Sequence, residues 1–184
     1  YVIAHARGSD AKGDAWFNDG RMMNKKNTFN DMIDVAEFLI QKRFTSPDKL
    51  ALRGSSAGGL LVGATINMRP DLFRAAIASV PFVDVLTTML DPTIPLTTIE
   101  YQQWGNPNER PAYDYIKSYS PYDNVHATSY PSVLAITGLA DQQVGYWEPT
   151  KWVQKLRDFS TSSNEILLKV NFNSGHSGDS GRVA

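Results

Sequence analysis

Gly54-Ser55-Ser56-Ala57-Gly58 is the most informative stretch of this sequence. The apolar run of residues 49–53 precedes it, and residues 59–68 after it are small or apolar enough to form a helix. A G-x-S-x-G motif between a strand and a helix forms a tight turn that lifts the serine hydroxyl above the edge of a sheet. Ser56 is therefore a candidate nucleophile, although the same pattern also occurs in ordinary turns in which a serine caps a helix.

The overall composition fits one globular domain. Of the 184 residues, 42% are hydrophobic, which is enough to bury a sizeable core. Eighteen basic and nineteen acidic residues leave a formal net charge of -1, so we expect neither nucleic acid nor a membrane as a partner. The chain has no cysteine, which excludes disulfides and a thiol nucleophile and suits a reducing compartment, so we expect a cytoplasmic protein. No apolar run approaches the roughly 18 residues of a membrane span.

Alternating apolar runs and helical patterns predict an α/β fold. Thr28 and Asp31 resemble a capping box at the start of the first long helix. Because each connection between strands is long enough to hold a helix, we predict a mostly parallel sheet with helices on both faces. The expected strands are residues 1–5, 49–53, 75–80, 132–137 and 166–171, and the expected helices are about 28–43, 59–68 and 149–159.

Residues 81–131 form a long segment that is rich in proline and aromatic residues. It is too long for a plain connection between two strands, and connections of this length are either disordered or functional. The aromatic content favours an ordered insertion that forms a cap or a pocket wall.

Ser56, Asp141 and His176 each follow shortly after the end of an expected strand. Ligands bind beyond the carboxyl ends of parallel strands, so these three side chains are expected to meet at one edge of the sheet. The chain order Ser, Asp, His is that of the α/β-hydrolases, and we predict that fold. In this interpretation His176 takes the proton of Ser56, and Asp141 orients the imidazole ring.

The other polar residues indicate no second site. His5 and His126 are interpreted as structural residues, since His5 ends a strand that carries no triad member in this fold and His126 lies in a polar loop. The sequence has no cluster of His, Asp and Glu at metal spacing and no phosphate-loop pattern near Gly8. We therefore expect no metal and no cofactor.

Several longer runs resemble the prolyl oligopeptidase family of serine peptidases, most closely its oligopeptidase B branch. The resemblance covers nearly the whole chain, and the runs around Trp104 and Tyr119 are far more specific than the G-x-S-x-G motif. The runs that carry it are residues 24–29, 53–60, 80–85, 101–107, 118–125, 138–149 and 175–176.

The resemblance implies an activity and a set of catalytic residues. Oligopeptidase B cleaves short peptides after arginine or lysine, here through an acyl-enzyme on Ser56. By resemblance, Asp141 and His176 complete the triad, and the main-chain N–H of Ala57 is one donor of the oxyanion hole.

The resemblance also implies that Phe82 and Glu100 line the primary specificity pocket. A carboxylate in a partly desolvated pocket pairs bidentately with guanidinium, and an aromatic face packs on the side-chain stem or the cation. The sequence departs from the family at Gln102, where a second acid is common, and at Ser9, where the family has a second glycine. The first departure leaves the strength of basic selection open.

Finally, the resemblance predicts that the fold is incomplete at both ends of the chain. In the α/β-hydrolase order the five expected strands are the fourth to the eighth, and the third strand lies between the fourth and the fifth. The first three strands, the tyrosine that supplies the second oxyanion donor, a β-propeller and a terminal helix would lie outside residues 1–184. The alternatives are another α/β-hydrolase, acting on esters or selecting proline, and a non-catalytic relative that binds peptides. The oligomeric state stays open.

Overall fold

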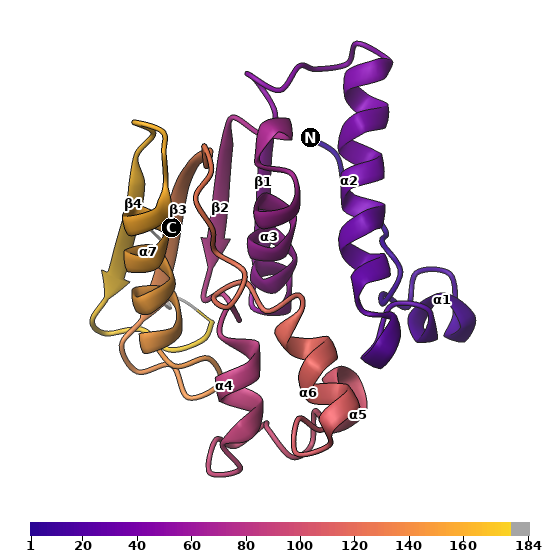
Figure 1. Ribbon diagram of the computed structural model, residues 1–184, viewed down its shortest axis with the longest axis vertical. Helices are drawn as coiled ribbons and strands as arrows, with labels where there is room; N and C mark the ends of the chain where they lie inside the picture. The colour runs from indigo at the N-terminus through magenta and orange to yellow at the C-terminus, as the bar shows by residue number, and fades with distance from the viewer. Residues whose placement is uncertain (178–184) are drawn as a thin grey trace.

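The computed structural model describes residues 1–177, and its centre is a parallel sheet in the order β1-β2-β3-β4 (Figure 1). Alternate residues of each strand point to the same face, so the buried residues form rows across the sheet. One such row places Leu52 opposite Ala76, Ala76 opposite Val133, and Val133 opposite Ile166. The strands are β1 (Ala51–Ser55), β2 (Ala75–Ser79), β3 (Ser132–Gly138) and β4 (Ile166–Asn171).

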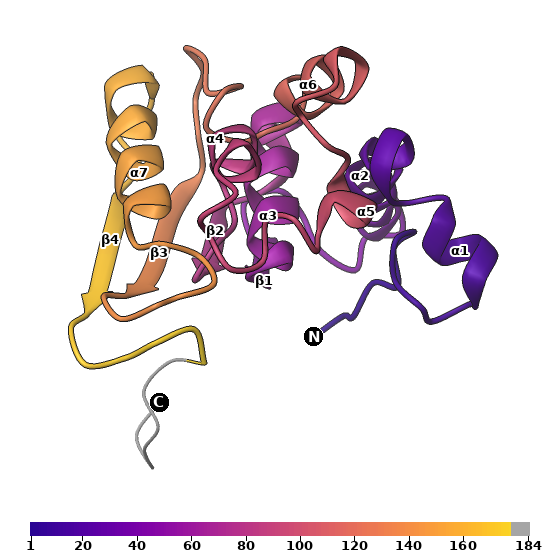
Figure 2. The same cartoon turned by 90° about the horizontal axis from the view of Figure 1, so that it is seen from below.

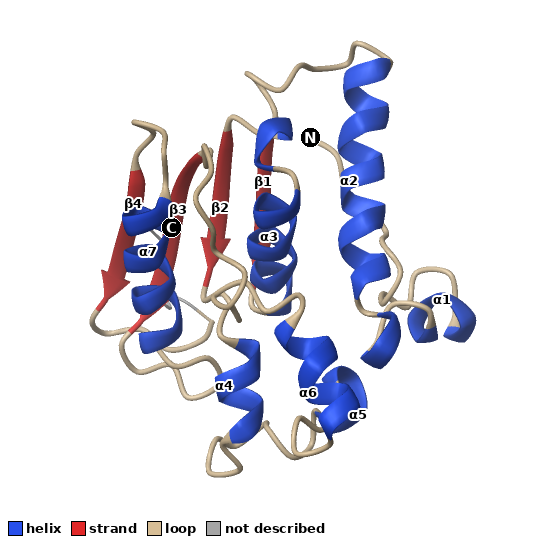
Figure 3. Cartoon of the chain, viewed as in Figure 1, coloured by secondary structure: helices blue, strands red, loops and turns tan. Residues whose placement is uncertain are grey.

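The helices that pack on the sheet lie on one face. Figures 1 and 3 show α3 and α7 in front of the strands with α2 beside α3, and Figure 2 shows α3 and α7 again on the same side. The strand order never reverses, and right-handed crossovers then place every helix on one side. The helices are α1 (Asp14–Asn18), α2 (Lys26–Gln41), α3 (Ala57–Met68), α4 (Val85–Leu90), α5 (Tyr101–Trp104), α6 (Arg110–Lys117) and α7 (Trp147–Phe159), with 3-10 turns η1 (Met22–Asn24) and η2 (Pro70–Leu72).

The predicted parallel α/β sheet is therefore confirmed, but residues 1–177 hold only one of the two predicted helical layers. The core lies between that layer and the sheet. Ile66 of α3 and Trp152 and Leu156 of α7 are fully buried in one cluster with Ala78 and Ala135 of the sheet. Each large apolar side chain buried there contributes about 1.5–3 kcal/mol.

The predicted strand at residues 1–5 is wrong. These residues form no strand, and Tyr1, Val2 and Ile3 are all more than half exposed. A cavity of about 500 Å³ separates residues 1–4 from β1, and β1 has a partner strand on one side only within the described residues. An extended segment becomes a buried strand only when neighbouring strands pair its backbone groups, and no strand among residues 1–177 pairs with this segment.

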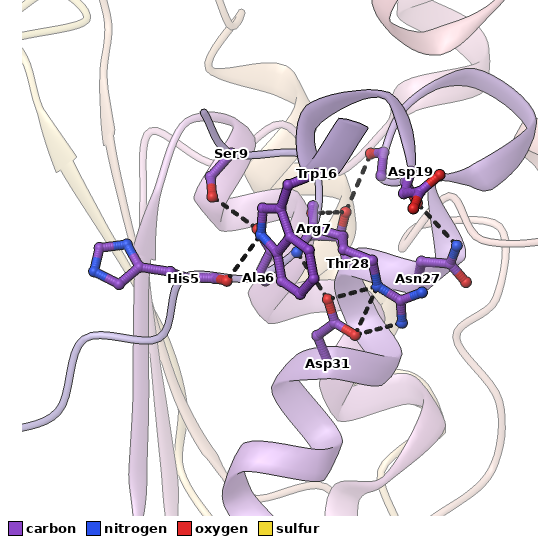
Figure 4. A network of polar contacts seen from close by, with 10 residues as sticks. His5, Ala6, Arg7, Ser9, Trp16, Asp19, Asn27, Thr28 and Asp31 are labelled. Carbon is purple, nitrogen blue, oxygen red and sulfur yellow. Dashed lines mark hydrogen bonds and ion pairs between the residues drawn. The ribbon is translucent and has the colours of Figure 1, made fainter. Parts of the chain in front are cut away.

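The predicted capping box at Thr28 and Asp31 is also wrong. Thr28 lies inside the first turn of α2, and its hydroxyl donates to the carbonyl oxygens of Arg7 at 2.7 Å and Gly20 at 3.2 Å. The Asp31 carboxylate accepts hydrogen bonds from the Arg7 backbone N–H at 2.7 Å and from Arg7 Nε at 3.0 Å (Figure 4). These polar groups hold the N-terminal segment on the helix instead of capping it.

The segment 81–131 is ordered and contains the three short helices α4, α5 and α6. They gather below the carboxyl ends of the strands (Figure 1). Tyr119 packs the segment against Phe29 of α2, with ring centroids 5.5 Å apart. Within the segment, the rings of Phe82 and Trp104 pack with their centroids 5.4 Å apart. The insertion thus covers the edge of the sheet at which a ligand site is expected.

Candidate active site

Ser56 occupies a strained turn between β1 and α3. Its backbone has φ 55° and ψ −119°, a combination that non-glycine residues rarely adopt. Two hydrogen bonds hold the turn, one from Ser56 N to Ser79 O at 2.9 Å and one from Phe82 N to Ser56 O at 3.1 Å. The G-x-S-x-G pattern therefore forms the nucleophile elbow that the sequence predicted.

At two positions around this turn, only glycine fits, because neighbouring atoms leave no room for a Cβ atom. A Cβ on Gly54 would lie 2.2 Å from the carbonyl oxygen of Gly58, and a Cβ on Gly59 would lie 2.4 Å from Pro81 Cβ. Gly58 differs, since a Cβ there would meet nothing within 4 Å. The first turn of α3 can thus pack directly over the end of β1.

The structure brings Ser56, Asp141 and His176 together. His176 Nε2 lies 2.9 Å from Ser56 Oγ, and His176 Nδ1 lies 2.8 Å from Asp141 Oδ2. When Nδ1–H donates to the carboxylate, Nε2 is free to accept the serine proton. The side chain of Asp141 is fully buried and that of His176 is 17% exposed, so this contact is shielded from water while the ring stays accessible.

The loops that carry Asp141 and His176 are tied to each other. Leu139 N donates to Asn171 O at 3.0 Å, and Ala140 N donates to Ser174 O at 3.1 Å. The second carboxylate oxygen of Asp141 accepts the backbone N–H groups of Gln143 and Val144, both at 2.9 Å. Asp141 therefore orders its own loop and still presents one oxygen to His176.

A pocket beside Ser56 contains both of the residues expected to select the substrate, Phe82 and Glu100. Glu100 Oε2 accepts a hydrogen bond from Trp104 Nε1 at 2.7 Å, and Gln102 is exposed. The pocket is lined by Ser56, Ala57, Phe82, Thr88, Met89, Ile94, Leu96, Thr97, Glu100, Trp104, Gln143 and Val144.

Ala57, the expected oxyanion donor, is the first residue of α3 and also lines this pocket. Backbone N–H groups in the first turn of a helix have no partner within that helix. The Ala57 N–H therefore comes from a position that can bind an oxyanion formed next to Ser56.

Sequence reasoning missed the acidic residues behind the pocket. Asp84 and Glu148 are each 1% exposed, and burial raises the pKa of Glu148 to about 7. Local sequence does not reveal this burial, because an acidic residue in the first turn of a helix is an ordinary surface feature. Tertiary packing alone places Glu148 in the interior.

The described residues contain no group of three His, Asp or Glu side chains placed to hold a metal ion. Across residues 1–177, each helix is too short or too polar to cross a bilayer.

Comparisons with known proteins identify the family of this chain. The sequence model of the Prolyl oligopeptidase family matches residues 1–184. Dipeptidyl aminopeptidase BI of Pseudoxanthomonas mexicana is 52% identical over 99% of this chain and 25% of its own length, and Protease 2 of Moraxella lacunata is 53% identical over 99% and 26%. The chain thus spans about a quarter of the length of these relatives.

Solved structures give the same result. Oligopeptidase B from Leishmania major superposes with a TM-score of 0.93 at 57% identity, over 95% of this chain and 24% of that one. Oligopeptidase B from Trypanosoma brucei, solved in a closed form with covalently bound antipain, gives 0.93 at 56% identity, over 95% and 25%. With a family match along its whole length and these relatives, the chain belongs to the prolyl oligopeptidase family.

Proposed function

We propose that residues 1–184 are part of the catalytic domain of a longer serine peptidase that hydrolyses short peptides after arginine or lysine. The observation that carries this proposal is the position of His176, within hydrogen-bond distance of both Ser56 and Asp141 and beside a pocket that holds Glu100. The length of the relatives supports the first part, because the chain covers 25% of one and 26% of another. A β-propeller outside these residues would restrict access to short peptides.

In the first half of the reaction, Ser56 Oγ attacks the carbonyl carbon of the scissile peptide bond while His176 Nε2 takes the hydroxyl proton. The carbonyl oxygen becomes an oxyanion, which the Ala57 N–H stabilises. The tetrahedral intermediate then breaks its C–N bond, and His176 delivers its proton to the leaving amine. The amine product departs, and the acyl group remains on Ser56.

In the second half, water replaces the amine. His176 removes a proton from the water molecule as its oxygen attacks the acyl carbon, and a second oxyanion forms. The C–O bond to Ser56 breaks, and the proton returns from His176 to the serine oxygen. Throughout the cycle the Asp141 carboxylate holds the ring orientation and stabilises the imidazolium.

We propose that Glu100 and Phe82 select the side chain that enters the pocket, and that the insertion 81–131 forms the pocket wall. A guanidinium or ammonium group would pair with the Glu100 carboxylate, whose Oε2 is held by Trp104 Nε1. The Phe82 side chain is 5% exposed and offers its ring to the aliphatic stem. The indole of Trp104, packed at 5.4 Å from Phe82, supports both residues.

The name of one relative favours a second candidate, release of dipeptides from a free N-terminus. That relative, dipeptidyl aminopeptidase BI, is 52% identical to this chain. The same triad and pocket would serve both activities. Cleavage at internal positions and release of dipeptides differ only in how the protein binds the part of the substrate that precedes the cleaved bond.

The test uses the complete protein, with its Ser56→Ala variant as the control for contaminating peptidases. Peptides that carry arginine at several internal positions, with free or acetylated N-termini, are digested and the products identified by mass spectrometry. Cleavage after arginine in acetylated peptides at any position supports the first candidate, and cleavage confined to the second residue of free peptides supports the second. Cleavage of esters only, cleavage after proline only, or peptide binding without turnover would refute both.

A further inference from the structure

Glu148 is a buried carboxylate that packs against the back of the specificity pocket. It lies in the first turn of α7 and is 1% exposed. Its Oε2 atom accepts the backbone N–H groups of Val83 at 3.0 Å and Asp84 at 2.9 Å, and its Oε1 atom accepts the Thr88 hydroxyl at 2.6 Å. Burial on this scale is rare for a glutamate, and none of these three partners is a cation.

The partners of Glu148 belong to the wall of the pocket beside Ser56. Thr88 lines that pocket together with Glu100, and Val83 directly follows Phe82, which lines it too. The Glu148 carboxylate therefore sits behind the wall, separated from the pocket by one threonine side chain. The carboxylate is almost fully shielded from solvent, so its charge is screened weakly.

The charged groups near Glu148 leave an excess of negative charge. Asp84 is as deeply buried as Glu148. Its Oδ2 atom pairs with the ammonium of Lys151, which lies on α7 one turn after Glu148. Its Oδ1 atom has no hydrogen-bond partner in the described structure. Lys151 thus pairs with Asp84, and the described structure shows no ion pair between Glu148 and a cation. Burial chiefly, and the charge of Asp84 to a lesser extent, raise the pKa of Glu148 to about 7.

We propose that Glu148 is a second acidic determinant of the specificity pocket, acting from behind Thr88 to favour a cationic side chain together with Glu100. This inference rests on the proposed function, because it assumes that an arginine or lysine side chain enters the pocket. A cation in the pocket stabilises the ionised form of Glu148, so its binding displaces the carboxyl proton. Binding of the cation consequently strengthens as the pH rises through neutrality.

Glu148→Gln is the variant that separates charge from hydrogen bonding. The amide oxygen of glutamine can accept the N–H groups of Val83 and Asp84, and its NH₂ group can donate to the Thr88 hydroxyl. Only the ionisable group is lost. Asp158→Asn is the matched control, because it removes one negative charge from an exposed position on the same helix.

The experiment measures peptide binding by isothermal titration calorimetry in the complete protein, with Ser56→Ala in every variant so that no peptide is cleaved. Two peptides differ only in arginine or citrulline at the residue before the scissile bond. The arginine peptide should bind about three- to tenfold more tightly at pH 8 than at pH 6, the size expected for one screened charge pair, and should release protons at pH 7. Citrulline should show neither effect.

Both effects should be smaller in Glu148→Gln than in the parent, and unchanged in Asp158→Asn. Contributions from other ionisable groups are common to all the variants, so the difference isolates Glu148. A pH dependence and proton release as large in Glu148→Gln as in the parent would overturn the inference. Equal affinity for arginine and citrulline peptides at every pH in the parent would instead refute the proposed selection for basic residues.

Thr88→Val provides a second test, which decides the question even where Glu148→Gln fails to fold. The Thr88 hydroxyl lowers the pKa of Glu148 by donating to the ionised carboxylate. Its removal should therefore shift the midpoint of the binding profile for the arginine peptide to higher pH, and Thr88→Ser should restore it. An unchanged midpoint in Thr88→Val would contradict the role given to Glu148.

Discussion

His176 Nε2 lies 2.9 Å from Ser56 Oγ, although 120 residues separate the two in the chain. They follow β1 and β4, which stand at opposite edges of the described sheet. The segment after β4 therefore runs back across the carboxyl ends of the strands, where Asp141 meets it from the end of β3. This convergence aligns a base with a hydroxyl, which is the arrangement that activates serine.

The first prediction is that Ser56 of the complete protein reacts rapidly with a fluorophosphonate, because only an activated hydroxyl attacks such a reagent quickly. Ser55 is the internal control, since it is exposed at the end of β1 and has no histidine partner in the described structure. Peptide mapping by mass spectrometry should find the label on Ser56 in the parent and in Ser55→Ala, and no label in Ser56→Ala. A label at another position of the active protein would contradict the assignment of the nucleophile.

The second prediction concerns Gly54 and Gly58, the two glycines of the G-x-S-x-G motif. The structure leaves room for a Cβ atom at Gly58 but not at Gly54. Gly54→Ala should abolish fluorophosphonate labelling of Ser56, because its Cβ would lie 2.2 Å from the carbonyl oxygen of Gly58 and would displace the turn. Gly58→Ala should keep the labelling and stabilise the protein by about 0.5–1 kcal/mol, since alanine is the better residue inside a helix. Thermal unfolding and labelling rates check both variants, and equal behaviour of the two would refute this account of the turn.

Local patterns predicted most of the sheet and the meeting of Ser56, Asp141 and His176 at its edge. The strand at 166–171 was predicted to the residue, because a bounded apolar run carries its own signal. Ser56, Asp141 and His176 were found because each follows such a run, and the topology of a parallel sheet then brings strand ends together. These features depend on short-range sequence and on the general rule that the carboxyl ends of parallel strands meet at one edge of the sheet.

The features that local patterns missed depend on contacts between distant parts of the chain. Thr28 and Asp31 have the spacing of a capping box, but their partner is Arg7, more than twenty residues away. The apolar residues 1–5 have a strand-like composition, yet pairing depends on a neighbour that composition does not reveal. Glu148 was missed for the same reason, since its burial depends on residues 83–88 packing against α7.

The third prediction is that Glu100→Gln lowers kcat/KM for an arginine substrate by about ten- to a thousandfold in the complete protein. This corresponds to roughly 1.5–4 kcal/mol, the loss expected when one partner of a desolvated ion pair becomes neutral. The amide oxygen of glutamine can still accept the hydrogen bond from Trp104 Nε1, so the pocket should keep its shape. Steady-state kinetics with arginine and citrulline substrates checks this, and citrulline should lose much less. Equal losses for both substrates would show that Glu100 acts on the scaffold.

The last prediction is that residues 1–184, expressed alone, hydrolyse peptides at least a hundredfold more slowly than the complete protein. One edge of β1 is unpaired within the described residues, and a cavity of about 500 Å³ lies between that edge and residues 1–4. A cavity of this size next to open backbone groups is the space that a further strand would fill, and without one the end of β1 that carries Ser56 is poorly supported.

In the proposed complete protein, residues outside 1–184 would also supply the second oxyanion donor, as the resemblance to the family implies. Loss of one such donor typically costs about 10²–10³ in kcat, even where the rest of the site is intact. Circular dichroism and a turnover assay on the purified 184-residue chain, set beside the complete protein, measure folding and catalysis separately. A cooperatively folded chain with the kcat of the complete protein would show that β1 needs no further strand and that residues 1–184 contain every donor the oxyanion requires.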